Sequence, residues 1–209
     1  MTPATPTVFV VDDDISVRES LQLLIQCEGW HPQTFASSQE FLDNPRVLVA
    51  SCLVLDVSLP GLNGLDLQKR IAVERSDMPI IFITGYGDVP TTVRAMKAGA
   101  VEFLTKPFSD DTLLNAIRQA IERSRVALAY EAEMQSLRNC YGSLTHRERQ
   151  VMELVVSGRL NKQVGGELGI SEITVKAHRG KVMQKMKADS LAELVNIAAR
   201  LRLPGLPKA

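Results

Sequence analysis

Short apolar runs alternate with amphipathic stretches along the first 125 residues. Runs of the kind expected of strands covered on both faces lie at residues 8–11, 52–55, 80–83 and 101–104, with a weaker one near 30–35. Between them, apolar residues recur at helical spacing, as at Val17, Leu21, Leu24 and Ile25. The pattern predicts a fivefold β-α alternation. It therefore predicts a doubly wound α/β fold with a five-stranded parallel sheet, whose functional site lies at the carboxyl ends of the strands.

The sequence changes character after residue 122. Residues 123–142 are rich in helix formers, which predicts a helical linker. Beyond them, Thr145 and Glu148 have the spacing of a capping box, and Ser171 and Ser190 stand where N-caps are expected. Four short helices with a glycine turn between the second and third predict an all-α helix-turn-helix domain. The expected divisions are residues 1–122, 123–142 and 143–209.

Charge is unevenly distributed although the formal net charge is zero. Residues 1–125 hold 11 Lys and Arg against 16 Asp and Glu, a net charge of −5, whereas residues 145–209 hold 12 against 6, a net charge of +6. A basic segment attracts nucleic-acid phosphates whatever the base sequence. The distribution therefore favours nucleic-acid contact by the C-terminal part, although charge alone is weak evidence.

Other sequence features limit the class of protein. No apolar run approaches the roughly 20 residues needed to span a bilayer, and the start of the chain lacks the basic and apolar regions of a signal peptide. We therefore expect a cytoplasmic protein without a membrane partner. Cys27, Cys52 and Cys140 are odd in number and far apart, which favours buried free thiols over a disulfide framework or a zinc site.

Acidic residues follow two of the predicted strands. Asp12, Asp13 and Asp14 follow the first strand and Asp56 follows the third, and these strands are neighbours in a doubly wound sheet. A hard cation such as Mg²⁺ would neutralise the crowded carboxylates. With Thr84 and Lys106 at the ends of the fourth and fifth strands, the residues suit phosphoryl transfer to an Asp56 nucleophile. The alternative is a solvated turn or helix cap, with Lys106 in an ordinary ion pair.

Residues 7–122 resemble the receiver domain of two-component systems, a flavodoxin-like fold. The resemblance is carried by VFVVDDD, LVLDVSLPGLNG, IIFITGYGDVP and MKAGAVEFLTKPF, and the third of these is similar to the FixJ branch. It implies that Asp56 is the phosphoacceptor and that Thr84 and Lys106 contact the phosphoryl group. It also implies a switch formed by Thr84 and Phe103. The implied Mg²⁺ ligands are Asp12 through water, Asp13, Asp56 and the backbone carbonyl of Ser58.

The third helix of the C-terminal domain carries the basic side chains. Ile173, Val182 and Met186 are expected to face the helical bundle, which leaves an outward basic face for the major groove. A merely solvated basic face is the alternative. We expect Lys176, Arg179, Lys181 and Lys185 on this face.

Residues 143–203 resemble the LuxR/FixJ-type DNA-binding domain, through motifs such as SLTHRERQ and ISEITVKAHR. His178 is expected to lie in the core or against phosphate, and not to be a metal ligand. Relatives usually carry Ala at the position of Gly165, so Gly165 and Gly166 predict a looser helix. The DNA-contact candidates implied by the resemblance are Asn161, Lys162, Thr174, Lys176, His178, Arg179 and Lys181.

Together these features predict a response regulator and not an enzyme. A sensor histidine kinase would phosphorylate Asp56, and the phosphorylated chain would bind promoter DNA as a homodimer and activate transcription, with RNA polymerase as a further partner. Two alternatives remain at this point: a phosphatase-like hydrolase that uses the acidic crevice, and a DNA binder that works without phosphorylation. No additional general base or glycine-rich cofactor loop supports the hydrolase.

Overall fold

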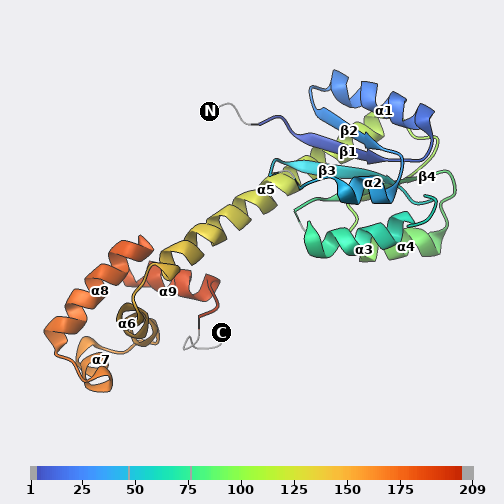
Figure 1. Cartoon of the computed structure of the whole chain (residues 1–209). Helices are drawn as coiled ribbons and strands as arrows, with labels where there is room; N and C mark the ends of the chain where they lie inside the picture. Colours follow the sequence, from blue (N-terminus) through green and yellow to red (C-terminus); the bar gives the residue numbers. More distant parts are fainter. Residues whose placement is uncertain (1–3, 47, 76, 204–209) are drawn as a thin grey trace. The chain divides into compact units, whose positions relative to one another are not determined.

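The computed structural model describes residues 4–46, 48–75 and 77–203 and confirms the predicted fold (Figure 1). Within these residues the strands form one parallel sheet of order β2-β1-β3-β4-β5. The elements of the α/β part are β1 (Thr7–Val11), α1 (Ile15–Cys27), β2 (His31–Phe35), α2 (Ser38–Asp43), β3 (Ser51–Asp56), α3 (Gly64–Glu74), β4 (Ile80–Thr84), α4 (Val89–Lys97), β5 (Glu102–Thr105) and α5 (Asp110–Gly142).

Both faces of the sheet are covered, as the continuous apolar runs predicted. Because successive side chains of a strand point to opposite faces, Val8 and Val10 pack with α1 and α5, whereas Phe9 and Val11 pack with α2, α3 and α4. The inner strands β1, β3 and β4 are therefore buried along their whole length, whereas the edge strands β2 and β5 are partly exposed. The buried polar groups of the inner strands lie at the strand ends.

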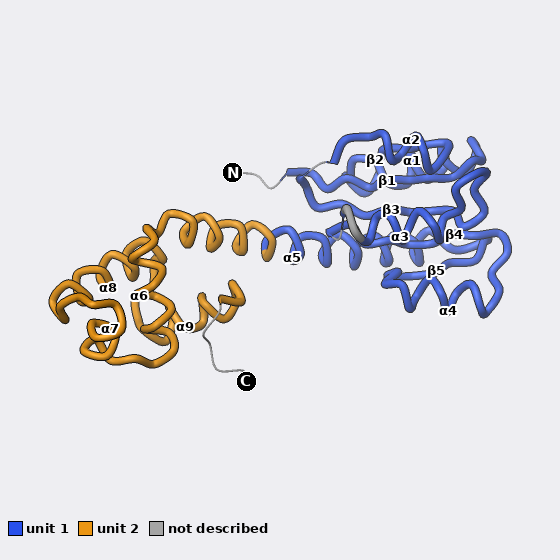
Figure 2. Tube along the Cα trace, turned by 60° about the horizontal axis from the view of Figure 1, so that its bottom comes forward, with its two compact units in different colours: residues 1–129 blue, residues 130–209 orange. Residues whose placement is uncertain are grey.

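Helix α5 continues through the segment predicted as a helical linker. The chain divides into two compact units, residues 1–129 and 130–209 (Figure 2), so the division falls inside residues 123–142. The last turns of α5 belong to the second unit: Met134 is buried, and Leu137 and Tyr141 pack against the core of this unit. An ion pair of 2.6 Å between Arg200 and Glu133 adds to this packing.

The second unit contains the four predicted short helices, α6 (His146–Val156), α7 (Asn161–Leu168), α8 (Glu172–Met186) and α9 (Leu191–Arg200). Thr145 and Glu148 form the predicted capping box, and Ser171 and Ser190 cap α8 and α9. Gly169 ends α7 with a φ of 65°, a conformation that favours glycine.

Two expectations about burial are wrong. Ile173 does not face the bundle, because it lies on the exposed side of α8 while Val175 takes the buried position together with Val182 and Met186. Of the three cysteines, which are all free, Cys52 is buried but Cys27 is exposed.

An ion pair between the buried Glu148 and the half-buried Lys185 joins α6 to α8. Glu148 Oε2 accepts hydrogen bonds from Lys185 Nζ (2.7 Å) and from the Thr145 backbone N–H (2.8 Å). The bond to Lys185 and the capping contacts with Thr145 lower the pKa of Glu148 from 4.5 to about 2, although burial opposes this shift. Lys185 was expected on the outward basic face, but this contact and a bond to the Ser143 carbonyl (3.1 Å) bind it to the domain.

The adjacent glycines of α7 have different surroundings. A Cβ added to Gly165 would lie 2.7 Å from the backbone oxygen of Ile170, whereas one added to Gly166 would meet no atom within 4 Å. Gly165 thus permits the close turn that leads to α8. Packing therefore requires a glycine at position 165 but not at position 166.

Replacing each glycine by alanine tests this difference. We expect Gly166→Ala to raise the free energy of unfolding by about 0.5 to 1 kcal/mol, because alanine stabilises a helix relative to glycine. Gly165→Ala should lower it, because the Ile170 carbonyl must move. Chemical denaturation of the two variants measures both values, and equal values would contradict the packing argument.

Acid unfolding tests the Glu148 ion pair. Since the pKa of Glu148 is lowered in the folded protein, its stabilisation is present above about pH 4.5 and is lost as the pH falls towards 2. Glu148→Gln should lower the free energy of unfolding by about 2 kcal/mol at neutral pH and weaken its dependence on pH in that window. Thermal unfolding across pH measures this. Glu167→Gln, which removes an exposed ion pair with Arg159, is the control.

Candidate functional site

An acidic cluster lies at the carboxyl ends of β1 and β3. Asp12 follows β1 directly and Asp56 ends β3, and the parallel register that pairs Val11 with Leu55 sets these two residues opposite each other. Oxygen atoms of Asp12, Asp13 and Asp56 lie within 4.8 Å of one another. Asp12 and Asp56 are buried, whereas Asp13 is exposed. The structure therefore brings together the carboxylates that the sequence placed at two separate strand ends.

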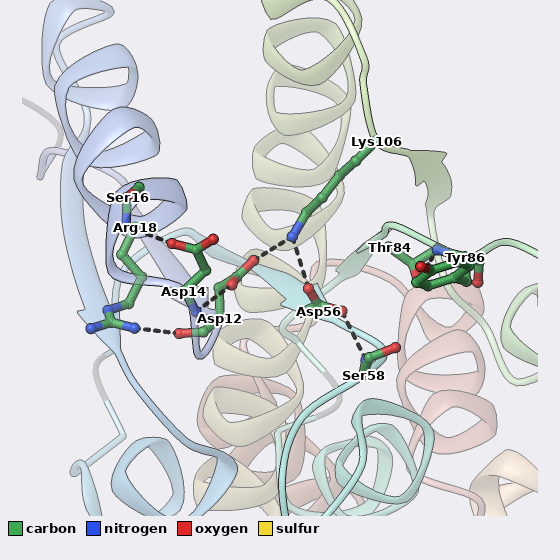
Figure 3. A network of polar contacts seen from close by, with 9 residues as sticks. All are labelled: Asp12, Asp14, Ser16, Arg18, Asp56, Ser58, Thr84, Tyr86 and Lys106. Atoms are coloured by element: carbon green, nitrogen blue, oxygen red, sulfur yellow. Dashed lines mark hydrogen bonds and ion pairs between the residues drawn. The ribbon is translucent and has the colours of Figure 1, made fainter.

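The ammonium group of Lys106 bridges this cluster (Figure 3). Its Nζ donates hydrogen bonds to Asp12 Oδ2 (2.7 Å) and Asp56 Oδ2 (2.8 Å). The other carboxylate oxygens accept backbone N–H groups, from Asp14 to Asp12 Oδ1 (2.9 Å) and from Ser58 to Asp56 Oδ1 (2.8 Å). Both buried carboxylates are therefore held in fixed orientations. Asp12, Asp56 and Lys106 come from the ends of three different strands, β1, β3 and β5.

Burial and charge act against each other at this site. Burial raises the pKa of Asp12, although the hydrogen bond from Lys106 partly offsets the effect. Burial acts to lower the pKa of Lys106, but its hydrogen bonds to Asp12 and Asp56 outweigh burial and raise it. Lys106 is thus held as a cation, and its single positive charge faces three carboxyl groups.

Thr84 and Phe103 lie on neighbouring strands, Thr84 at the end of β4 and Phe103 on β5 opposite Phe82. Thr84 is buried at the end of β4, where its hydroxyl oxygen lies 3.2 Å from both the backbone N–H and the carbonyl of Tyr86. The Phe103 ring lies 6.0 Å from that of Phe82, centroid to centroid. Gly87 lies near this ring as well: an added Cβ there would lie 2.5 Å from the methyl group of Thr105 and 3.4 Å from the Phe103 ring. Thr84 and the Phe103 ring thus lie beside Gly87, a loop position at which a larger side chain would collide with Thr105.

Two contributors were not recognised in the sequence. Arg18 Nη1 donates to the Asp12 carbonyl (2.7 Å), and Gly64 lets α3 begin beside Asp56, because a Cβ there would lie 2.4 Å from the Asp56 carbonyl. Asp14 accepts the Ser16 N–H and caps α1, so the helix-cap alternative holds for this residue. The second glycine of the LPGLNG motif was the available signal for Gly64, whereas no local pattern identified Arg18.

The donor set suits a small hard cation. Three carboxylates supply oxygen ligands, which is the chemistry that Mg²⁺ prefers, and the exposed Asp13 leaves one side accessible to water. Asp12, Asp13 and Asp56 could therefore hold such an ion. The observed contact of Ser58 with Asp56 is made by its backbone N–H.

The DNA-contact candidates of the second unit differ in exposure. Lys162, Lys176 and Lys181 are exposed, whereas Asn161, Thr174, His178 and Arg179 are half-buried. Arg179 Nη1 donates to Asn161 Oδ1 (3.2 Å), a contact that joins α8 to the start of α7. Lys176 lies 3.7 Å from Glu172, and the hydroxyl groups of Thr174 and Ser171 lie 2.8 Å apart. The exposed lysines are thus the most accessible cations of this set.

Comparisons with known proteins agree with both parts of the chain. Residues 8–118 match the response regulator receiver domain, and residues 142–198 match the bacterial regulatory proteins of the luxR family. Nodulation protein W of Bradyrhizobium diazoefficiens is 51% identical over 93% of this chain and 86% of its own length. The transcriptional regulatory protein FixJ of the same organism is 45% identical over 92% and 94%. The solved structure of the response regulator StyR is 47% identical, with a TM-score of 0.84 over 94% of this chain and 100% of that one.

A receiver domain followed by a luxR-type DNA-binding domain defines a two-component transcription regulator. This chain belongs to the FixJ-type response regulators, a non-enzymatic family, so the hydrolase alternative is not supported. None of the helices within residues 4–46, 48–75 and 77–203 combines the length and apolar character required to cross a membrane.

Removing one carboxylate tests the electrostatics of the cluster. Without divalent cations, Asp13→Asn should raise the free energy of unfolding by about 1 kcal/mol, because one like charge near Asp12 and Asp56 is lost. The same variant should gain less stability than the unaltered protein when Mg²⁺ is added. Thermal unfolding with a chelator and with Mg²⁺ measures both effects. Asp43→Asn, an exposed carboxylate outside the cluster, should leave the Mg²⁺ effect unchanged, and an identical response of Asp13→Asn would contradict the site.

Proposed function

We propose that this protein is a transcription activator switched by phosphorylation of Asp56. The observation that supports the proposal best is the position of the Asp56 carboxylate, which is held by Lys106 and the Ser58 amide beside Asp12 and Asp13. A sensor histidine kinase is the donor. An Asp56 oxygen forms a bond to the phosphorus atom while the bond from phosphorus to the kinase histidine breaks, which leaves an acyl phosphate on Asp56.

Each residue of the cluster has a separate task in this transfer. Lys106 exchanges its contact with the Asp56 carboxylate for one with a phosphoryl oxygen and neutralises its charge. Asp12, Asp13, Asp56 and the Ser58 carbonyl would hold Mg²⁺, which would supply charge neutralisation for the phosphoryl oxygens when bound. The backbone N–H of Ser58 orients Asp56 from the other side.

The switch uses Thr84 and Phe103. On phosphorylation the Thr84 hydroxyl leaves the Tyr86 backbone and donates a hydrogen bond to the phosphoryl group, and the Phe103 ring turns towards the space that Thr84 vacates. Phe103 has no hydroxyl group, so this rotation is controlled by packing against Phe82 and Gly87. The movements of Thr84 and Phe103 thereby change the surface formed by α4 and β5.

We propose a second copy of the chain as the partner of the altered surface. Tyr86, Val89, Val93 and Met96 expose apolar side chains on the β4-α4 loop and α4. Pairing two receivers joins two DNA-binding domains, which raises affinity for an operator with two half-sites. Asn161, Lys162, Thr174, Lys176, His178, Arg179 and Lys181 are the proposed DNA contacts.

The remaining partners follow from the proposed DNA contact. Since the protein binds promoter DNA, we propose that it acts in the cytoplasm. As an activator bound upstream of a promoter, it would have RNA polymerase as a further partner. Within the described part of the second unit, Lys176 and Lys181 are exposed cations suited to phosphate contacts.

Removal of the phosphoacceptor tests the switch. With a small-molecule phosphodonor and Mg²⁺, the unaltered protein should incorporate phosphate, dimerise and bind promoter DNA at least tenfold more tightly, because avidity joins two half-site contacts. Asp56→Asn should lose all three responses. Phosphate labelling, sedimentation and DNA-binding titration measure them, with Asp66→Asn as a control at an exposed carboxylate. Activation that persists in Asp56→Asn would support DNA binding without phosphorylation.

A further inference from the structure

An exposed isoleucine stands at the start of the recognition helix. Ile173 is the second residue of α8, and 81% of its surface is accessible, more than for any other large hydrophobic residue among the described residues of the second unit. Ile173 is not part of the hydrophobic core, to which α8 contributes the buried residues Val175, Val182 and Met186. Ile173 therefore contributes little to holding this unit together.

The helical spacing places Ile173 on a particular face. Residues of an α-helix are separated by about 100° around its axis, so Ile173 and Ala177 lie opposite the buried Val175. Lys176 and Lys181 lie on the two flanks of this face, and all four residues are exposed. Near the start of the helix, the centre of this face therefore carries the apolar Ile173 side chain. The cations Lys176 and Lys181 lie on either side of it.

This arrangement separates two kinds of contact with DNA. Flanking lysines suit the phosphates on either side of a groove, whereas residues near the start of a recognition helix reach the base edges. An isoleucine can form no hydrogen bond with a base edge. The one apolar group that bases present in the major groove is the C5-methyl group of thymine.

We propose that Ile173 is a specificity-determining residue that packs against the C5-methyl group of a thymine in the major groove. The inference rests on the proposed DNA binding and adds the base that this side chain selects. Cytosine and uracil lack the methyl group, so either base at this position removes the contact without changing the phosphates.

The test compares thymine with uracil in a selected duplex. The full chain, activated with a small-molecule phosphodonor and Mg²⁺, selects a duplex from a pool of random sequence, and each thymine is then replaced singly by deoxyuridine. At one position in each half-site, the loss of the methyl group should weaken binding of the unaltered chain about fourfold. Ile173→Ala should bind the thymine and uracil duplexes equally at that position.

Leu160→Ala is the matched control. Leu160 is also highly exposed in the second unit but lies before α7, so its removal should preserve the ratio between thymine and uracil. Circular dichroism checks that both variants fold, as expected for exposed side chains.

The outcomes separate the inference from the proposed function. If no duplex is selected, DNA recognition itself fails and the inference fails with it. If a duplex is selected but the unaltered chain shows no loss at any uracil, or Ile173→Ala keeps the same loss, the function stands and the role of Ile173 is overturned. Loss of transcription activation in Ile173→Ala with unchanged DNA selectivity would likewise overturn it and indicate a protein contact.

Discussion

The contact of one ammonium group with two buried carboxylates is central to the receiver part of the molecule. Lys106 lies within hydrogen-bond distance of Asp12 and Asp56, residues that come from different strand ends and would otherwise repel each other. Because β1 and β3 are parallel neighbours, their carboxyl ends meet at one edge, and the same register that builds the core also builds the site. A change in the charge of Asp56 would therefore disturb Lys106, and this coupling is the physical basis of the proposed switch.

The second unit uses its charged residues for two purposes. The contact between Lys185 and Glu148 fixes α8 against α6, whereas Lys176 and Lys181 remain exposed. The net positive charge of residues 145–209 is thus only partly available to DNA. Rigid attachment of the recognition helix matters because base contacts require side chains to be held at a defined position in the groove.

Local sequence patterns predicted most of the fold and much of the candidate site. The strands and helix caps were predictable because burial on both faces and capping bonds impose residue types at fixed spacing. The assignment of Ile173 to the core was wrong, because several apolar residues of α8 were compatible with an inward face and only packing selects between them. The roles of Lys185 and Arg18 were missed for a similar reason, since their partners are distant in sequence or are backbone atoms.

What the sequence by itself determined is the order of elements, the sheet and the residue types gathered at its edge, because periodicity and chain connectivity are local properties with few compatible topologies. Only the tertiary structure decided which aspartate caps a helix and which shares Lys106, why Gly165 differs from Gly166, and which lysines stay accessible. These outcomes depend on distances between atoms of separate segments. Such distances are set by packing of the whole domain, and no local pattern encodes them.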